Sequence, residues 1–377
     1  MQTDYDIAIV GGGLAGLAAS IQLKRLGYSV ILFEKDSFPH HKVCGEYVSL
    51  ESKDFLMALG LPVNELHLPI IDTLLLTAPN GKVLTTKLPL GGMGISRYLL
   101  DSSLASIAQQ AGVVVSEKTK IDDVKSIDNY FSIVVSNKQI TAKICCGAFG
   151  KRSNLDIKWN RDFVHRQNNR LNNYVGVKYH VRTNWKENVI GLHNFKNGYC
   201  GISKIEDDKY CLCYMTRAEN LKASGNSITQ MEEKVLYQNP HLKTIFQQSE
   251  ILQHFPVTIS QISFSQKEKV ERNMLMLGDA AGMITPLCGN GMSIALHTSK
   301  IAAELIHLFM QGKLSTDDLL KHYQQHWQQN FASRLKTGRI LQSFFGSNSL
   351  SNLLVSMFVI FPSLAKPLIR LTHGKPF

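Results

Sequence analysis

The sequence lacks the features that define several large protein classes. Its 377 residues include seven cysteines, an odd number with no C-x-x-C pair, which indicates neither a disulfide framework nor a zinc site. No apolar run reaches the ~20 residues that a transmembrane helix needs. A strand pattern begins at Tyr5, so no charged segment and apolar core of a secretory signal precede it. These absences predict a globular protein in a reducing, cytoplasmic setting.

Acidic residues are also few relative to basic ones. The chain has 41 Lys and Arg against 30 Asp and Glu, a formal net charge of +11. This excess favours anionic partners, such as phosphorylated cofactors, acidic substrates or anionic lipid headgroups. Because no basic cluster is interleaved with aromatic residues, nucleic acid is not an expected partner. The length and a hydrophobic fraction of 44% predict two or three folded domains rather than disorder.

The first positive feature is a glycine-rich turn near the N-terminus. The apolar run Ile7 to Val10 is typical of a buried parallel strand, and it ends at Gly11. Gly11, Gly13 and Gly16 form G-x-G-x-x-G, which allows a sharp turn, close approach of backbone to a pyrophosphate and tight helix packing. The helix predicted from Leu14 to Leu26 directs its N-terminal amides at that phosphate.

A second predicted strand, residues 28–33, ends at Glu34, whose carboxylate can accept a hydrogen bond from a ribose 2′-hydroxyl. Strand, glycines, helix, strand and acid occur in the order of the full dinucleotide fingerprint. Glu34 argues against a 2′-phosphate and favours FAD or NAD. The residues expected at the cofactor here are Gly11, Gly13, Leu14, Ala15, Gly16, Glu34 and Lys35.

A second glycine-rich motif follows the apolar run Met274 to Leu277. It reads Gly278-Asp279-Ala280-Ala281-Gly282, continues through a loop around Pro286, and opens a long apolar helix. An acid at a strand end can hold a polyol hydroxyl, and a helix N-terminus can present amides to an electron-rich ring edge. This combination suits a flavin.

Together with Arg97, the two motifs closely resemble those of the FAD-dependent aromatic hydroxylases and geranylgeranyl reductases, over about residues 4 to 310. The resemblance implies that FAD is bound, that Arg97 lies against the FAD phosphates and that Asp279 binds the ribityl chain. It also implies that the loop before the helix faces the isoalloxazine. The residues implied in this second motif are Gly278, Asp279, Pro286, Gly289, Asn290, Gly291 and Met292.

We therefore expect an α/β fold: a Rossmann-type FAD-binding domain with an inserted β-sheet substrate domain and a helical C-terminus. A hairpin is predicted around Asn80-Gly81, and strands with long turns fill residues 174–264. The expected FAD-binding domain is discontinuous, at 1–70, 96–170 and 265–312. The substrate domain takes 71–95 and 171–264, and C-terminal helices with an apolar, basic tail take 313–377.

Two reactions remain open, both with NAD(P)H as a transient electron donor. The first is hydroxylation of a lipophilic aromatic, phenolic or quinone-like substrate, which we expect, and the second is reduction of polyprenyl double bonds. Halogenases of this superfamily carry Trp-x-Trp-x-Ile-Pro, which is absent here. Phe149 replaces the acid of the family's Gly-Ala-Asp-Gly. The carboxylate associated with coupling NAD(P)H binding to flavin movement in the hydroxylases is therefore missing. A non-catalytic flavin-binding module is the competing class.

The loop from Pro39 to Ser49 resembles its geranylgeranyl reductase counterpart more than the hydroxylase one. Within it, Cys44 is a candidate reactive thiol and Glu46 a candidate acid or base. The alternatives are a buried inert cysteine and a solvated loop glutamate. Other residues that could face the pocket are His180, His193 and His297.

The C-terminal tail combines an apolar run, Leu350 to Phe361, with basic residues at Lys366, Arg370, His373 and Lys375. The run is too short to span a bilayer, and the pattern predicts binding of residues 350–377 to a membrane surface. The alternative is a helix packed on the core or at a dimer interface. The expected partner is otherwise a lipophilic small molecule, and the protein is expected as a monomer or dimer.

Overall fold

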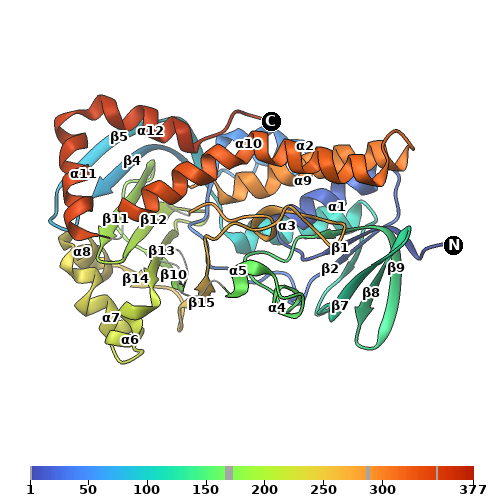
Figure 1. Cartoon of the computed structure of the whole chain (residues 1–377). Helices are drawn as coiled ribbons and strands as arrows, with labels where there is room; N and C mark the ends of the chain where they lie inside the picture. The colour runs from blue at the N-terminus through green and yellow to red at the C-terminus, as the bar shows by residue number, and fades with distance from the viewer. Residues whose placement is uncertain (1, 166–172, 286–288, 345–346) are drawn as a thin grey trace.

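The computed structural model describes residues 2–165, 173–285, 289–344 and 347–377 (Figure 1). Its first sheet has eight strands, ordered β16-β17-β9-β1-β2-β6 along the main path, with β7 and β8 joined beside β9. The strands of this sheet are β1 (Tyr5–Val10), β2 (Val30–Phe33), β6 (Val114–Ser116), β7 (Asp123–Ile127), β8 (Tyr130–Val135), β9 (Lys138–Gly147), β16 (Val270–Glu271) and β17 (Met274–Met276).

Strand β1 lies at the centre of this sheet because it can be buried on both faces. Ile7, Ala8 and Ile9 are fully buried, and β1 pairs in parallel with β2 and with β9. The helix that follows, α1 (Leu14–Arg25), packs against both α3 (Arg97–Gln110) and α9 (Gly291–Met310). This is the Rossmann-type arrangement that the N-terminal motif predicts.

The second sheet has nine strands, ordered β14-β10-β13-β12-β11-β4-β5-β3, with β15 also paired to β10. Most of its neighbours are antiparallel, and the hairpin of β4 and β5 turns at Asn80-Gly81, where Gly81 has φ +86. The strands are β3 (Tyr47–Ser49), β4 (Ile70–Thr77), β5 (Val83–Gly94), β10 (Tyr174–Arg182), β11 (Val189–Phe195), β12 (Gly198–Lys204), β13 (Tyr210–Arg217), β14 (Glu250–Ile251) and β15 (Val257–Ile262).

Short helices complete the two halves. One hydrophobic cluster includes Val177, Leu212 and Tyr214 of the second sheet together with Met231 and Leu242 of the helices that cover it. The helices of this cover are α6 (Ala218–Ala223), α7 (Ile228–Lys234), η2 (Leu236–Gln238) and α8 (Pro240–Gln248). Elsewhere lie η1 (Leu50–Ser52), α2 (Lys53–Ala58), α4 (Asn154–Lys158), α5 (Asp162–His165) and η3 (Gly278–Ala280).

The C-terminal part is helical and reaches across both halves. In Figure 1, α10 (Thr316–Phe344) runs beside α9, and α11 (Asn348–Ile360) and α12 (Ala365–Thr372) lie at the end of the second sheet. The 3-10 helix η5 (Pro362–Leu364) joins the last two. Among the described helices, none combines the length and apolar character needed to cross a membrane. The expected α/β fold with a helical C-terminus is confirmed.

Three local features differ from the expectation. Strand β3 lies in the range assigned to the FAD-binding domain, yet it pairs with β5 in the second sheet. Strand β7 was not expected because its sequence, Asp-Val-Lys-Ser-Ile, carries little apolar character. Helix α8 was also missed, although Asn239 caps it and Pro240 occupies its first turn. Strand β3 matters most, because it carries the chain from one sheet to the other beside the candidate site.

Candidate functional site

The first glycine-rich loop leaves open space where a phosphate is expected. At Gly11 a Cβ atom would lie 2.4 Å from the carbonyl oxygen of Ala148, and at Gly16 it would lie 2.0 Å from that of Gly11. At Gly13 a Cβ would meet only the Arg97 guanidinium, at 3.9 Å. Gly11 and Gly16 are therefore needed for close packing, whereas Gly13 borders free space at the N-terminus of α1, where unpaired amides point.

Glu34 and Lys35 differ in what they can do at this loop. Glu34 is buried, and its Oε2 accepts the Gly12 amide at 2.8 Å while its Oε1 accepts the Asp36 amide at 3.1 Å. Its carboxylate has further acceptor positions for a ribose hydroxyl. The Lys35 side chain is exposed and pairs with Asp36 at 3.2 Å, so it points to solvent.

Arg97 lies in a buried charge cluster rather than on a solvated surface. Its Nε and Nη2 donate to the two Asp101 oxygens, both at 2.7 Å, and Lys42 Nζ donates to Oδ2 of the same carboxylate at 2.9 Å. Burial alone would raise the Asp101 pKa, but the charges of Arg97 and Lys42 hold that pKa below its usual value. Two cations against one carboxylate leave positive charge beside Gly13, which suits a pyrophosphate.

The second motif offers unpartnered polar atoms. Gly278 opens η3 with φ +56, and its amide donates to Thr298 Oγ1 at 3.0 Å. The Asp279 carboxylate forms no hydrogen bond or ion pair with other described residues. At the start of α9, Asn290 Oδ1 and Ser293 Oγ are buried without a partner in the described chain.

These features fit a flavin that lies along the start of α9. Met292 is buried there, Gly291 begins the helix, and Gly289 faces the Tyr47 ring, 3.2 Å from where a Cβ would lie. The Tyr47 hydroxyl is also buried without a partner among the described residues. Pro286 falls outside the described residues. The donors and acceptors left open therefore match the polar edge of an isoalloxazine and its ribityl chain.

The turn bearing Asp279 is held from behind by two buried cations. Lys267 Nζ donates to the Asp279 carbonyl at 2.8 Å and to the Lys151 carbonyl at 2.7 Å, and Arg161 Nη1 donates to the Ala280 carbonyl at 3.2 Å. Burial lowers the Lys267 pKa to about 8. The two side chains thus fix the turn's backbone.

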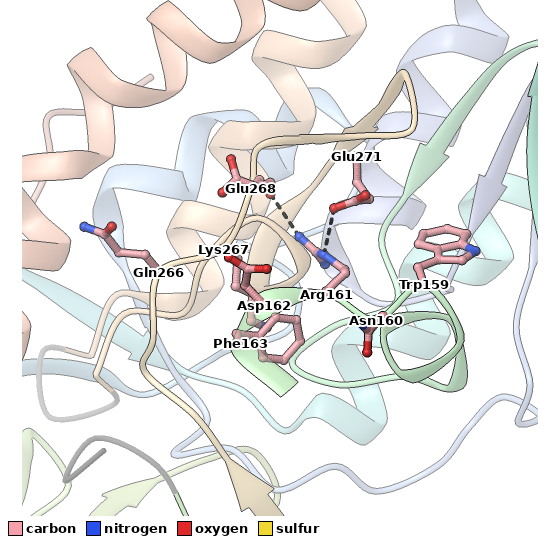
Figure 2. A pocket seen from close by; sticks show the side chains of 9 residues that line it. All are labelled: Trp159, Asn160, Arg161, Asp162, Phe163, Gln266, Lys267, Glu268 and Glu271. Carbon is pink, nitrogen blue, oxygen red and sulfur yellow. Dashed lines mark hydrogen bonds and ion pairs between the residues drawn. The ribbon is translucent and has the colours of Figure 1, made fainter. Parts of the chain in front are cut away.

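Both cations line a pocket of about 230 Å³. Figure 2 shows Arg161 pointing toward Glu271, 3.3 Å away, and toward the Glu268 carbonyl, 3.1 Å away. Because the groups of Arg161 and Lys267 are already bonded to protein atoms, this pocket supports the cofactor turn rather than presenting free cations to a ligand. The residues that line it are Trp159, Asn160, Arg161, Asp162, Phe163, Gln266, Lys267, Glu268 and Glu271.

A third group of polar residues gathers around Glu46, between the two sheets. Glu46 is fully buried and has φ 54, in the left-handed region. Its carboxylate accepts Lys178 Nζ at 2.7 Å and the Arg97 amide at 2.9 Å, and it lies 2.6 Å from His180 Nε2. Glu46 is therefore a buried ion-pair partner, and the solvated-loop alternative is wrong.

The charges in this cluster favour an ionised Glu46. Burial would raise its pKa, but the hydrogen bond from His180 and the charge of Lys178 outweigh burial, so the pKa is lowered. Burial would lower the Lys178 pKa, and the Glu46 carboxylate raises it above its usual value. His180 continues outward through an edge contact with His41, whose ring stacks on Tyr98. A row of titratable groups thus links buried Glu46 to the surface.

Cys44 and Cys213 are the two half-buried thiols of this region. The Cys44 sulfur accepts the Glu46 amide at 3.5 Å and lies within interaction range of the Arg97 guanidinium. The Cys211 thiol donates to the Cys44 carbonyl at 3.2 Å. Burial raises the pKa of Cys213 to about 12, so this neighbour is a poor source of thiolate.

The other two histidines named from sequence lie elsewhere. His193 is buried within the second sheet, where its Nδ1 lies 3.0 Å from Thr77 Oγ1 and burial lowers its pKa to about 3. His297 stacks on the Phe377 ring. Lys178 was missed, although a lysine inside the apolar strand Tyr-Val-Gly-Val-Lys-Tyr-His-Val-Arg is an unusual feature that could have indicated a buried ion pair. Where the family carries an acid, Phe149 packs edge-on against Trp159.

Comparison with known proteins identifies curated relatives of this chain. Among curated proteins, conditioned medium factor receptor 1 of Dictyostelium discoideum is 25% identical over 90% of this chain and 70% of its own length. A digeranylgeranylglycerophospholipid reductase of Methanocaldococcus jannaschii is 26% identical over 90% of this chain and 87% of its own. One from Methanococcus vannielii is 20% identical over 87% and 83%.

Solved structures show the same fold. A flavin-dependent brominase has a TM-score of 0.79 at 18% identity, covering 99% of this chain and 94% of its own. A geranylgeranyl bacteriochlorophyll reductase-like protein of Thermoplasma acidophilum has a TM-score of 0.78 at 18% identity, covering 97% and 99%. Residues 4–335 match the FAD binding domain family. The chain therefore belongs to this family and is an FAD-dependent oxidoreductase.

Proposed function

We propose that this enzyme uses NAD(P)H-reduced FAD to reduce carbon–carbon double bonds of a polyprenyl lipid. This is the second of the two reactions that the sequence left open. The observation that carries it is the half-buried Cys44 thiol beside the buried cluster of Glu46, Lys178 and His180. The similarity to two digeranylgeranylglycerophospholipid reductases supports the substrate class.

Double-bond reduction needs an acid from the protein. When bound, reduced FAD supplies a hydride to one carbon, and the other carbon must receive a proton. In our proposal the Cys44 thiol donates that proton. The thiolate that remains is stabilised by the Glu46 amide and by the nearby Arg97 guanidinium. The His41 and His180 pair, which reaches the surface, can return the proton from solvent.

An anaerobic turnover experiment tests the reaction. The enzyme is reduced with NADPH, oxygen is excluded, and a geranylgeranyl lipid is added while flavin absorbance and product mass are followed. We expect the flavin to be reoxidised and the product to gain two hydrogen atoms per reduced double bond. Reoxidation only with oxygen, with a phenol gaining an oxygen atom, would instead establish the hydroxylase. Flavin that NAD(P)H never reduces would show that this enzyme takes its electrons from another donor.

Cys44→Ser tests the acid within the same assay. The variant should keep its FAD and its reduction by NADPH, and lose turnover by about 10²-fold or more, the scale of a positioned general acid. Cys213→Ser is the matched control, because this thiol lies in the same region and its pKa is raised by burial. Near-normal turnover by Cys44→Ser would show that Cys44 is an inert cysteine and not the acid.

A further inference from the structure

The C-terminal stretch has an unusual charge distribution. The last acidic residue of the printed sequence is Asp318, and residues 319–377 contain no Asp or Glu. The same stretch holds seven basic residues: Lys321, Arg334, Lys336, Arg339, Lys366, Arg370 and Lys375. Arg334 is buried and pairs with Glu51, whereas the stretch itself supplies no acidic side chain to neutralise exposed cations such as Arg370 and Lys375.

Helix α11 is docked by one face only. Ser351, Val355 and Phe358 are buried. Two hydrogen bonds fix the helix to the β4–β5 hairpin: the Asn80 amide donates to Asn352 Oδ1 at 3.2 Å, and Lys82 Nζ donates to Ser356 Oγ at 3.0 Å. The alternative of a helix packed on the core is therefore correct for this face.

The opposite face of α11 is apolar and exposed. Leu350, Leu353, Met357 and Ile360 follow helical spacing and are 41%, 66%, 36% and 67% exposed. The surface continues through Phe361, Leu364 and Leu371, each about half exposed or more. Of 19 exposed large hydrophobic side chains among the described residues, ten lie between residues 340 and 371, so they form a concentration rather than single scattered residues.

We infer that this face, from Leu350 to Leu371, docks on the surface of an anionic lipid bilayer. Apolar side chains enter the boundary of the acyl chains, while cations such as Arg370 remain at the headgroups. A second copy of the chain is the less suitable occupant, because a symmetric contact would bring two acid-free, basic surfaces together. The surface stands on its own observations and does not depend on the proposed reaction.

The structure limits the membrane-binding surface to part of residues 350–377, the range expected from sequence. The segment after α12 is tied to the protein: the Gly374 amide donates to Glu51 Oε2, Arg334 pairs with the same carboxylate at 2.8 Å, and Phe377 stacks on His297. Removing residues 350–377 would therefore expose buried Glu51 and damage the core. Substitutions on the exposed face are the suitable test.

The test is co-sedimentation of the full-length holoenzyme with vesicles. We expect binding to phosphatidylcholine vesicles that contain phosphatidylglycerol, and weaker binding at 1 M than at 0.1 M salt, because the Debye length falls from about 10 Å to about 3 Å. The double variant Leu353→Ser and Ile360→Ser should bind at least tenfold more weakly, with an unchanged FAD spectrum. Ile157→Ser is the control, since this side chain is 54% exposed on α4, far from α11 (Figure 1).

A charge variant measures how much of the vesicle binding is electrostatic. Arg370→Gln with Lys375→Gln should weaken binding to the phosphatidylglycerol vesicles and leave binding to pure phosphatidylcholine unchanged. The inference is overturned if the wild-type protein ignores anionic vesicles at low salt, or if the Leu353 and Ile360 variant binds like the wild type. It is also overturned if that variant converts a dimer to a monomer in size-exclusion chromatography, because a second copy would then cover the face.

Discussion

Gly13 and Gly16 lie three residues apart, at the N-cap and in the first turn of α1, yet a side chain would meet different surroundings at each. A Cβ at Gly13 has no protein atom closer than 3.9 Å, whereas one at Gly16 would collide with the Gly11 carbonyl. Gly13→Val should therefore fold and lack FAD, because the added branch occupies the space that the pyrophosphate needs. Gly16→Val should fail to fold, because backbone cannot move away.

The measurement is flavin content after purification, with circular dichroism as the folding check. Gly13→Val should be colourless with a native-like spectrum. Full flavin occupancy in that variant would show that the pyrophosphate does not lie at this loop.

Glu46 allows a test of the buried ion pair. Glu46→Gln leaves the Lys178 charge without its carboxylate, and should reduce the free energy of unfolding by about 3 to 5 kcal/mol. The double variant Glu46→Gln with Lys178→Met should recover part of this loss, because no unpaired charge remains. Urea denaturation of the two single variants and the double variant measures the coupling. Additive losses would show that Glu46 and Lys178 do not stabilise one another.

The same pair predicts a pH dependence. Because the folded-state pKa of Glu46 lies below its ordinary value of 4.5, its contribution is fully present above that value and is lost as pH falls through the folded-state pKa. The stability difference between the wild type and Glu46→Gln should therefore shrink in acid. A difference that stays constant down to pH 3 would contradict an ionised Glu46.

The expected cofactor residues lie in local sequence motifs, whereas the polar cluster does not. Each flavin motif is a local run, so the positions of Gly13 and Asp279 follow from neighbours in the chain. Lys178 and His180 reach Glu46 across 132 and 134 residues of sequence, and only the packing of β10 against the Cys44 loop brings them together. No local sequence pattern predicts contacts between residues so far apart in the chain.

At the scale of an element, η3 depends on side chains outside itself. Lys267→Met removes the donors to the Asp279 and Lys151 carbonyls and leaves two part-buried acceptors without their protein partner, each at a cost of up to about 1 to 3 kcal/mol. The turn that presents Asp279 should loosen, and FAD should bind at least tenfold more weakly. Fluorescence titration of apoprotein with FAD measures this.

Lys269→Met is the matched control for that titration. Lys269 lies two residues away and over the Trp327 ring, and it contacts the Lys267 carbonyl rather than the cofactor turn. Its FAD affinity should stay within about threefold of the wild type. Equal weakening by both variants would indicate a general loss of packing instead of a specific support for η3.

Helices with a regular spacing of apolar residues could be predicted from sequence. Short strands that are defined by the strand they pair with could not. Helix α3 begins after Ser96, which accepts the Leu99 amide, and the sequence shows both this cap and the apolar spacing. Strand β3 has only three residues, and its membership in the second sheet follows from its partner β5 rather than from its own residues. Tyr47 therefore could not be placed beside Gly289 from sequence.

For the whole molecule, the main hydrophobic cluster crosses the boundary between the sheets. It contains Ile7 and Leu32 of the first sheet together with Leu76, Met93 and Tyr199 of the second. Because the halves share this core, the holoenzyme should unfold in a single calorimetric transition. FAD at 100 times its Kd should add about 2.7 kcal/mol of stability. Two separated transitions, with only one sensitive to FAD, would show that the sheets unfold independently.

The anchoring of Phe377 has a practical consequence for anyone who fuses another polypeptide to this enzyme. The Phe377 ring stacks on His297 of α9 at 4.2 Å, and its amide donates to the Glu51 carbonyl. An affinity tag attached there would begin beside the helix whose first turn borders the expected flavin site. A tag placed before Tyr5 would leave from the outer end of β1, away from the first turn of that helix (Figure 1). The amino-terminal fusion is therefore the safer choice for preparing fully flavinated protein.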